Sequence, residues 1–267
     1  MTHYLKYVFV IMTLAGVNTA YAQAKTQEHY QELEVGVGGN IKHTHTDVNY
    51  KNKEFDLHIH PLWESRYVTE GRDNLAGNGI ASIATEVNYK NFAVIPWAAK
   101  GISSDYSELN LNAIYTAHLS ERIEMYVGYN YIKAREDGID AHDNELSLDV
   151  AYFYADDIQL LSSVYHSFDA SGTFLDMAVK KDFYINDLLS VDIQSGVGFN
   201  AGYVSDGHNG VNNVKFTANL SYRLFNQLAL YTYTSYSIAV NKDEKRFVGD
   251  EALRNIFWGG VGLSYQY

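Results

Sequence analysis

The last nine residues, GGVGLSYQY (Gly259–Tyr267), alternate between two kinds of side chain up to the final position. On one side of a strand the alternation places an apolar or aromatic series, Val261, Leu263, Tyr265 and Tyr267. On the other side it places only Gly, Ser and Gln. Most domains end in a frayed tail, so a terminal strand this regular needs a hydrogen-bonding partner along its whole length.

The composition narrows the class of protein. There are 23 Tyr, 12 Phe and 3 Trp against 2 Pro, and aromatic residues of this abundance favour strands. The formal net charge of −12 argues against a nucleic-acid partner, because such a partner is bound through its phosphates. The chain has no cysteine, which excludes disulfides, thiolate metal sites and cysteine nucleophiles, and which suits an oxidising compartment.

The N-terminus indicates secretion. The segment MTHYLKYVFVIMTLAGVNTAYAQ has Lys6 near its start, an apolar run over Tyr7–Gly16 and an A-x-A cleavage site at Ala20-Tyr21-Ala22. The run is too short for a membrane anchor, which needs about 20 apolar residues. We therefore predict a signal peptide over residues 1–22 that is cleaved after Ala22.

From Phe55 onward the sequence repeats runs with two-residue periodicity, separated by polar connections. We count about twelve, most near the ~9–11 residues that a tilted strand needs to cross a bilayer. The predicted strands cover 54–67, 80–90, 92–102, 107–119, 122–134, 144–155, 158–168, 173–184, 189–201, 213–224, 228–240 and 256–267.

The connections alternate between short and long. Two-residue connections such as Lys90-Asn91 alternate with longer ones such as AREDGIDAHD (Ala134–Asp143) and NKDEKRFVGDEALRN (Asn241–Asn255). A soluble β-sandwich or a lipocalin-like barrel would share the periodicity. The uniformly long strands, the alternating connections and the Tyr near strand ends instead favour a transmembrane barrel with short periplasmic turns and long outer loops. The predicted fold is an all-β, antiparallel up-and-down barrel of about twelve strands over 54–267, in the outer membrane.

In a closed barrel the last strand pairs with the first, which explains why the terminal strand is complete. The C-terminal series Val261, Leu263, Tyr265 and Tyr267 also resembles the signal by which outer-membrane barrels are recognised for insertion, although Phe is the more usual last residue. The expected partners are therefore the barrel-assembly machinery and outer-membrane lipid, including lipopolysaccharide.

The stretch LWESRYVTEGRDN (Leu62–Asn74) resembles the first-strand motif of the TorF-like (Gcw_chp-type) family of Gram-negative outer-membrane porins. The S-x-Y-x-x-x-G pattern corresponds here to Ser65, Tyr67 and Gly71, although the family has Arg where this chain has Glu70. YKNFAVIPWAAKGISSDYSELNLNAIY (Tyr89–Tyr115) is similar to the following segment in order and spacing. The resemblance is loose and covers most of 55–200. It implies an outer-membrane barrel of poorly defined transport role and contributes little about the substrate.

If the apolar positions face lipid, the opposite positions line the lumen. Acids outnumber bases among them, so the pore is expected to favour cations mildly while small hydrophilic solutes diffuse through it. The same charges could instead pair across the lumen and fill it, because twelve strands lie between filled and open barrels. The predicted pore-lining residues are Asp56, Glu64, Arg66, Glu86, Glu108, Glu124, Glu145, Asp149, Asp176, Lys180, Asp192, Lys215 and Arg223.

Two H-x-H pairs occur, His43 with His45 and His58 with His60. Residues i and i+2 share a strand face, so each pair could chelate Zn²⁺ or Cu²⁺. Two His do not make a site and no third ligand is fixed by spacing, so no metal site is predicted. The segment 23–53, which carries the first pair, could be a periplasmic lead-in or could fold into the lumen.

An outer-membrane enzyme that hydrolyses lipids or peptides, or a structural or adhesive barrel without an open pore, would be the alternatives to a channel. The best catalytic candidate is YHSFDASG, with His166, Ser167 and Asp169. Adjacent strand residues point to opposite faces, so His166 and Ser167 cannot meet without a bulge. No G-x-S-x-G occurs, and GVGG at 36–39 lacks the setting of a nucleotide loop. We therefore predict neither catalysis nor a cofactor.

Two prolines fall inside predicted strands, Pro61 and Pro96. Proline removes a ladder donor and is expected at edges or bulges. Because a closed barrel has no edge, we predict a bulge at each, with a possible change of phase after Pro61.

Overall fold

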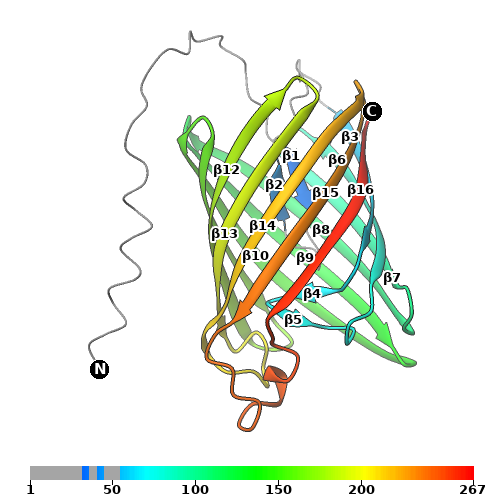
Figure 1. Cartoon of the computed structure of the whole chain (residues 1–267), viewed down its shortest axis with the longest axis vertical. Coiled ribbons are helices and arrows are strands. Elements are labelled where there is room, and N and C mark those ends of the chain that lie inside the picture. The colour runs from blue at the N-terminus through cyan, green and yellow to red at the C-terminus, as the bar shows by residue number, and fades with distance from the viewer. Residues whose placement is uncertain (1–31, 36–40, 45–54) are drawn as a thin grey trace.

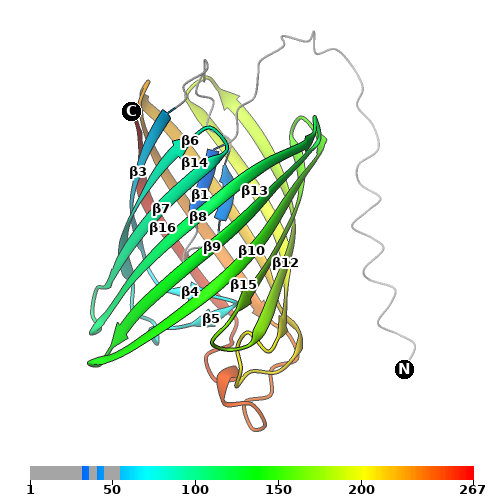
Figure 2. The ribbon, with the colours of Figure 1, turned by 180° about the vertical axis from the view of Figure 1, so that it is seen from behind.

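The computed structural model describes residues 32–35, 41–44 and 55–267, the first two ranges by their backbone alone. Twelve strands form a closed antiparallel barrel, and the predicted fold is confirmed (Figures 1 and 2). The predicted signal peptide lies outside the described residues. The barrel strands are β3 (Phe55–Glu64), β6 (Ile80–Tyr89), β7 (Phe92–Gly101), β8 (Tyr106–Ser120), β9 (Ile123–Glu136), β10 (Ile139–Ala155), β11 (Ile158–Ser167), β12 (Gly172–Asn186), β13 (Leu189–Ala201), β14 (Gly210–Phe225), β15 (Leu228–Ala239) and β16 (Ile256–Gln266).

The terminal strand has partners on both sides. β16 pairs with β15 along one edge and with β3 along the other, which closes the barrel. The pairing reaches the end of the chain, because the backbone N–H of Tyr267 donates to the carbonyl of Leu57 at 2.9 Å. The complete alternation of the last nine residues is therefore explained by their position at the seam between the first and last barrel strands.

Alternation along most strands separates an apolar outer face from a mostly polar inner face. On β8, Glu108 and Asn110 are 6% and 0% exposed, whereas Leu109 and Leu111 are 51% and 48% exposed. A soluble protein buries its apolar side chains and exposes its charged ones. This barrel does the reverse, as a barrel in contact with lipid must. Among the described residues, no helix is long and apolar enough to cross a membrane.

The two ends of the barrel differ. One end carries two-residue turns, such as Lys90-Asn91 and Asp156-Asp157, and is called the turn end here. The other carries the connections 65–79, 202–209 and 240–255 and is called the loop end. The last of these contains the short 3₁₀ helix η3 (Val248–Asp250) and hangs below the barrel in Figure 1.

The prediction of a long loop over Ala134–Asp143 is wrong. β9 and β10 remain paired through these residues and meet in a two-residue turn at Asp137-Gly138. Both turn residues have positive φ, +50° and +81°, which a tight hairpin turn that matches strand twist requires. The Asp-Gly dipeptide is the sequence signal that should have identified this hairpin.

The predicted bulges at the prolines are also wrong. Neither position shifts the register: Pro61 pairs with Ile83, and Pro96 pairs with Leu111. Instead, the ladder is interrupted on the opposite side of each proline, between β3 and β16 and between β6 and β7. The missing N–H thus costs a local ladder hydrogen bond without an inserted residue, and the phase of β3 is unchanged.

The lumen contains further chain. The connection 65–79, called the inner loop here, forms the small hairpin of β4 (Val68–Thr69) and β5 (Arg72–Asp73) and crosses the barrel interior near the loop end (Figures 1 and 2). The hairpin of β1 (Glu32–Val35) and β2 (Ile41–Thr44) lies behind the front wall of the barrel in both views, and therefore inside it.

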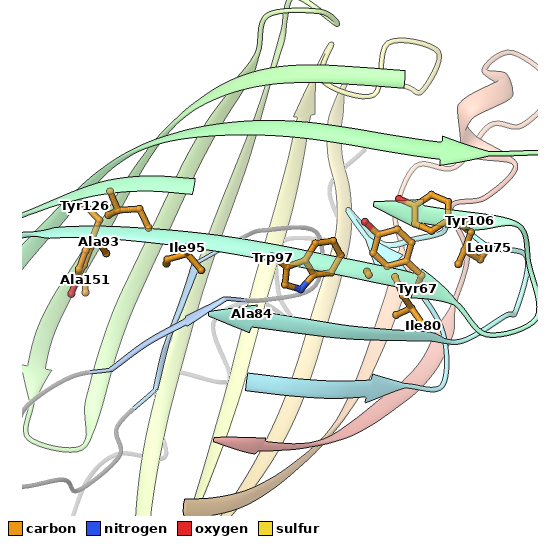
Figure 3. Packing of buried hydrophobic residues seen from close by; sticks show 12 residues of the cluster. Tyr67, Leu75, Ile80, Ala84, Ala93, Ile95, Trp97, Tyr106, Tyr126 and Ala151 are labelled. Atoms are coloured by element: carbon orange, nitrogen blue, oxygen red, sulfur yellow. The ribbon is translucent and has the colours of Figure 1, made fainter. Parts of the chain in front are cut away.

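One sector of the lumen is an apolar core. β7 is apolar on both faces, so Ala93, Ile95 and Trp97 point inward and are buried. The inner loop adds Tyr67 and Leu75 to this cluster, as Figure 3 shows. Each large apolar side chain buried in this way contributes roughly 1.5–3 kcal/mol, which favours a loop folded inward. In this sector the inner face of the barrel is therefore apolar and not charged.

Candidate functional site

The lumen is the candidate functional site, and most of the predicted pore-lining residues are buried on the inner faces of strands. Arg66 differs, because it lies on the inner loop and its guanidinium donates to Asp73 at 2.8 Å. The fully buried members are Asp56, Glu64, Glu86, Glu108, Glu145, Asp149 and Lys180. The half-buried members are Glu124, Asp176, Asp192, Lys215 and Arg223.

Tyrosine hydroxyls, rather than cations, satisfy many of the lumen carboxylates. Glu108 accepts from Tyr67 at 2.6 Å and also from Tyr106. Because a tyrosine donates a hydrogen bond without carrying positive charge, such a hydrogen bond does not by itself neutralise the acid. The other pairs of this kind are Glu64 with Tyr233, Glu70 with Tyr165, Glu124 with Tyr126, and Glu145 with Tyr203.

Ion pairs with lysine are less prominent inside the barrel. Lys180 and Asp182 are both buried on β12 and approach to 3.2 Å. At the turn end, the ring of His58 contacts the carboxylate of Asp56, two residues earlier on the same face. Pairs of this kind cancel some of the lumen charge. The hydrogen bonds that tyrosines donate to acids do not cancel charge.

The inner loop places Glu70 and Gly71 at the tip of the β4–β5 hairpin. Gly71 has φ +72°, and a Cβ there would lie 2.9 Å from the side chain of Asn213 on β14. Only glycine therefore permits the tip to approach this wall. Burial raises the pKa of Glu70, and Asp176 adds to the effect, while hydrogen bonds from Thr69 and Tyr165 oppose it.

Arg72, Asp250 and His208 join the inner loop to the two other long loops at the loop end, and this group is called the clasp here. The guanidinium of Arg72 donates to Asp250 at 3.1 Å, to Asn212 at 2.7 Å and to the carbonyl of Gly249 at 2.9 Å. The ring of His208 contacts the second oxygen of Asp250 at 2.7 Å. Asp250 is fully buried, so the clasp covers part of the loop end of the barrel.

A cavity remains between the inner loop and the wall formed by β10–β14, and it is called the lumen cavity here. Its empty volume, including the part open to solvent, is about 1000 Å³. The tip of the inner loop lines one side of it. The charged and aromatic residues that line it are Glu70, Asp149, Asp176, Lys215 and Trp258. Three of these, Asp149, Asp176 and Lys215, are among the predicted pore-lining residues.

Within the described residues, neither the catalytic candidate His166–Ser167 nor the metal candidate His58–His60 has the geometry of a site. His166 contacts the hydroxyl of Thr173 at 3.0 Å, whereas the hydroxyl of Ser167 accepts from the backbone of Ala170 at 2.9 Å. The rings of His58 and His60 stack with centroids 6.0 Å apart, and His45 lies outside the described residues. Within the described part of the chain, no group of three or more His, Cys, Asp or Glu could hold a metal ion.

Sequence reasoning did not assign a role to Glu70, Arg72, His208 or Asp250. All four lie in connections, where the two-residue period that identified the strands does not apply. The porin-like motif gave a partial signal. Its Ser65 bonds to the backbone of Gly259, its Tyr67 enters the apolar core, and its Gly71 forms the hairpin tip. The motif therefore marks the entry of the inner loop into the barrel.

Comparison with solved structures places the barrel among known porin folds. The KdgM porin matches with a TM-score of 0.55 and 11% identity, over 78% of this chain and 98% of that one. A KdgM porin in complex with disordered oligogalacturonate matches at 0.53 and 10% identity, over 79% and 98%. The NanC porin matches at 0.51 and 8% identity, over 78% and 98%. No protein-family model and no curated protein matches the chain.

These matches establish that the chain has a twelve-stranded outer-membrane porin fold like that of KdgM and NanC. All three of these structures are porins and not enzymes. At 8–11% identity the likeness concerns the fold alone.

Proposed function

We propose that this protein is an outer-membrane channel for the passive diffusion of small hydrophilic solutes, with a mild preference for cations. The observation that carries the proposal is the reversed distribution of side chains, in which apolar residues lie on the outer face of the barrel and charged residues on the inner face. Its outer face is apolar, whereas its inner face holds a solvent-open cavity lined by Asp149, Asp176 and Lys215. A closed barrel with lipid outside and charged groups inside is the arrangement that lets polar solutes cross a bilayer.

The cation preference is supported by the balance of charge in the lumen. Nine of the thirteen predicted pore-lining residues are acids, and several accept hydrogen bonds from tyrosines that carry no compensating charge. A field of one sign raises the local concentration of the opposite ion. One of the porins of similar fold was solved in complex with disordered oligogalacturonate, a polymer of sugar carboxylates. The acidic lumen of this chain suits a solute of different charge.

The proposal includes secretion by a signal peptide cleaved after Ala22 and assembly through the C-terminal aromatic strand. It also includes contact with outer-membrane lipid and lipopolysaccharide, and membership of the TorF-like family.

A structural barrel that does not conduct is the second candidate. The clasp favours it, because Arg72, His208 and Asp250 tie three loops together across the loop end.

Conductance in planar bilayers tests the proposal. We expect purified protein to conduct KCl and to show a reversal potential of cation-selective sign under a salt gradient. The double variant Glu124→Gln/Asp192→Asn should keep the conductance and shift the reversal potential toward zero, because it removes two lumen charges. Glu121→Gln is the matched control, since Glu121 lies exposed in a turn outside the lumen. Protein that never conducts would leave the structural barrel as the better interpretation.

A further inference from the structure

The walls of the lumen cavity carry a specific arrangement of charge. Asp149 on β10 pairs in register with Ser163 on β11, and Ser163 pairs with Asp176 on β12. The three residues therefore lie in one row across neighbouring strands. Adjacent strands are about 4.8 Å apart. The strands that carry Asp149 and Asp176 are therefore separated by roughly twice that distance, with Ser163 between them.

A cation stands on the far side of the same cavity. Lys215 on β14 pairs in register with Gly196 on β13, and Gly196 pairs with Ala178 on β12. Because Gly196 and Ala178 are small, they leave the space between Asp176 and Lys215 open. None of the described residues forms an ion pair or hydrogen bond with the Lys215 ammonium.

Asp149 is incompletely satisfied in this position. Its Oδ1 accepts a hydrogen bond from Ser163, whereas its Oδ2 is buried and has no hydrogen-bond partner within the described part of the chain. The residue as a whole is 5% exposed and lines the cavity. A buried acceptor without a partner is unfavourable, so a rotation of the Asp149 carboxylate that brings Oδ2 to a donor in the cavity would be favourable.

We propose that the lumen cavity binds small zwitterionic solutes of amino-acid size, which makes the channel selective for them. The solute ammonium would lie against Asp149, and its carboxylate would lie against Lys215. A neutral solute would gain neither contact. A singly charged ion would gain one contact and would meet a charge of its own sign at the other end of the cavity. This inference rests on the proposed function, because the solute must enter the lumen.

Four solutes of nearly equal size carry the two charges in every combination. Alanine has both the ammonium and the carboxylate, alaninamide has only the ammonium, lactate has only the carboxylate, and lactamide has neither. Uptake of each labelled solute into proteoliposomes is measured near pH 6 by stopped flow, and KCl conductance is recorded for the same preparation. We expect alanine to enter roughly threefold faster than lactamide, as one or two screened charge contacts would give.

Variants assign each end of the solute. Lys215→Gln should remove the advantage conferred by the carboxylate, and Asp149→Asn should remove the advantage conferred by the ammonium. Lys181→Gln and Asp157→Asn are matched controls, because these residues pair with each other at the turn end, outside the cavity. Lys215→Arg should retain the wild-type order of rates, which guards against a misfolded glutamine variant.

The outcomes separate the inference from the proposed function. Protein that conducts KCl but admits all four solutes at one rate would refute the zwitterion site and leave the channel intact. Equal effects of Lys215→Gln on all four solutes would also refute it, since that variant would then act on pore size alone. Absence of KCl conductance would overturn the channel and the site together.

Discussion

At the scale of single residues, several lumen acids in the described part of the chain accept hydrogen bonds from neutral donors. Glu108 and Glu70 take hydrogen bonds from tyrosines, and Asp192 takes one from Asn219 at 2.7 Å. Lysine or arginine partners would cancel the charge as well as the hydrogen-bonding demand. Neutral donors supply hydrogen bonds to the carboxylates and leave the negative potential of the lumen in place. A lumen needs such a potential of one sign to prefer ions of the opposite sign.

The clasp yields a prediction for one residue. Asp250→Asn should weaken the contacts to Arg72 and His208 and loosen the loop over 240–255. We expect trypsin to cut this loop roughly tenfold faster at neutral pH, since a charge-assisted hydrogen bond contributes about 1.5 kcal/mol. Lys242, Lys245, Arg246 and Arg254 supply the cleavage sites. Glu244→Gln is the control, because Glu244 is exposed and pairs with Lys242; equal rates for the two variants would contradict the prediction.

Asp250 also makes the stability of the loop 240–255 depend on pH. Burial raises the pKa of Asp250, but hydrogen bonds from the backbones of Asp243 and His208 and from the His208 ring outweigh it, so the pKa lies below 3.8. A lowered carboxyl pKa stabilises the folded loop at neutral pH, and this stabilisation is lost as the pH falls through the folded value. Pepsin should therefore cut the wild-type loop slowly near pH ~5 and faster near pH ~2, whereas Asp250→Asn should show a smaller change.

At the scale of elements, strands were recognisable where one face is apolar and the other polar. β8 and β16 follow this pattern over most of their length, the exceptions being the inward apolar residues Ile114 on β8 and Ile256 and Trp258 on β16. β7 does not, because its inner face packs against Tyr67 and Leu75 of the inner loop. The extension of β9 and β10 was missed for a different reason: past the bilayer, both faces of a hairpin meet water and the alternation carries no information.

β16 supports a prediction about assembly. Tyr267 ends the outward aromatic series and its N–H bonds to β3 across the seam. Tyr267→Ser should lower the yield of folded barrel in the outer membrane several-fold, measured as the heat-modifiable fraction on gels, because it removes the terminal aromatic that the assembly machinery is expected to bind. Ser264→Ala on the inner face of the same strand is the control. A normal yield from Tyr267→Ser would remove this residue from the signal.

At the scale of the whole molecule, the two ends of the barrel are built differently, which predicts its orientation. Short turns close one end, whereas the inner loop, the loop 202–209 and the loop 240–255 meet at the other. Long loops of outer-membrane barrels face outward, so we expect the loop end to face the exterior of the cell.

Epitope tags test the orientation. A tag placed between Asp137 and Gly138, or between Lys245 and Arg246, should be bound by antibody on intact cells. A tag at Asp156-Asp157 is the matched control on the turn end and should be reached only after the outer membrane is permeabilised. The opposite pattern would show that the barrel is inserted the other way.

The sequence by itself determined the number of strands, their approximate limits and which residues share a face. These properties follow from a period of two, which acts between near neighbours along the chain and is visible in a single strand. Only the tertiary structure decided that the inner loop enters the lumen, that β7 faces an apolar core, and that Arg72, His208 and Asp250 meet. Those contacts join residues as much as 178 positions apart. They depend on how the closed barrel brings its loops together in three dimensions, and no local pattern records that.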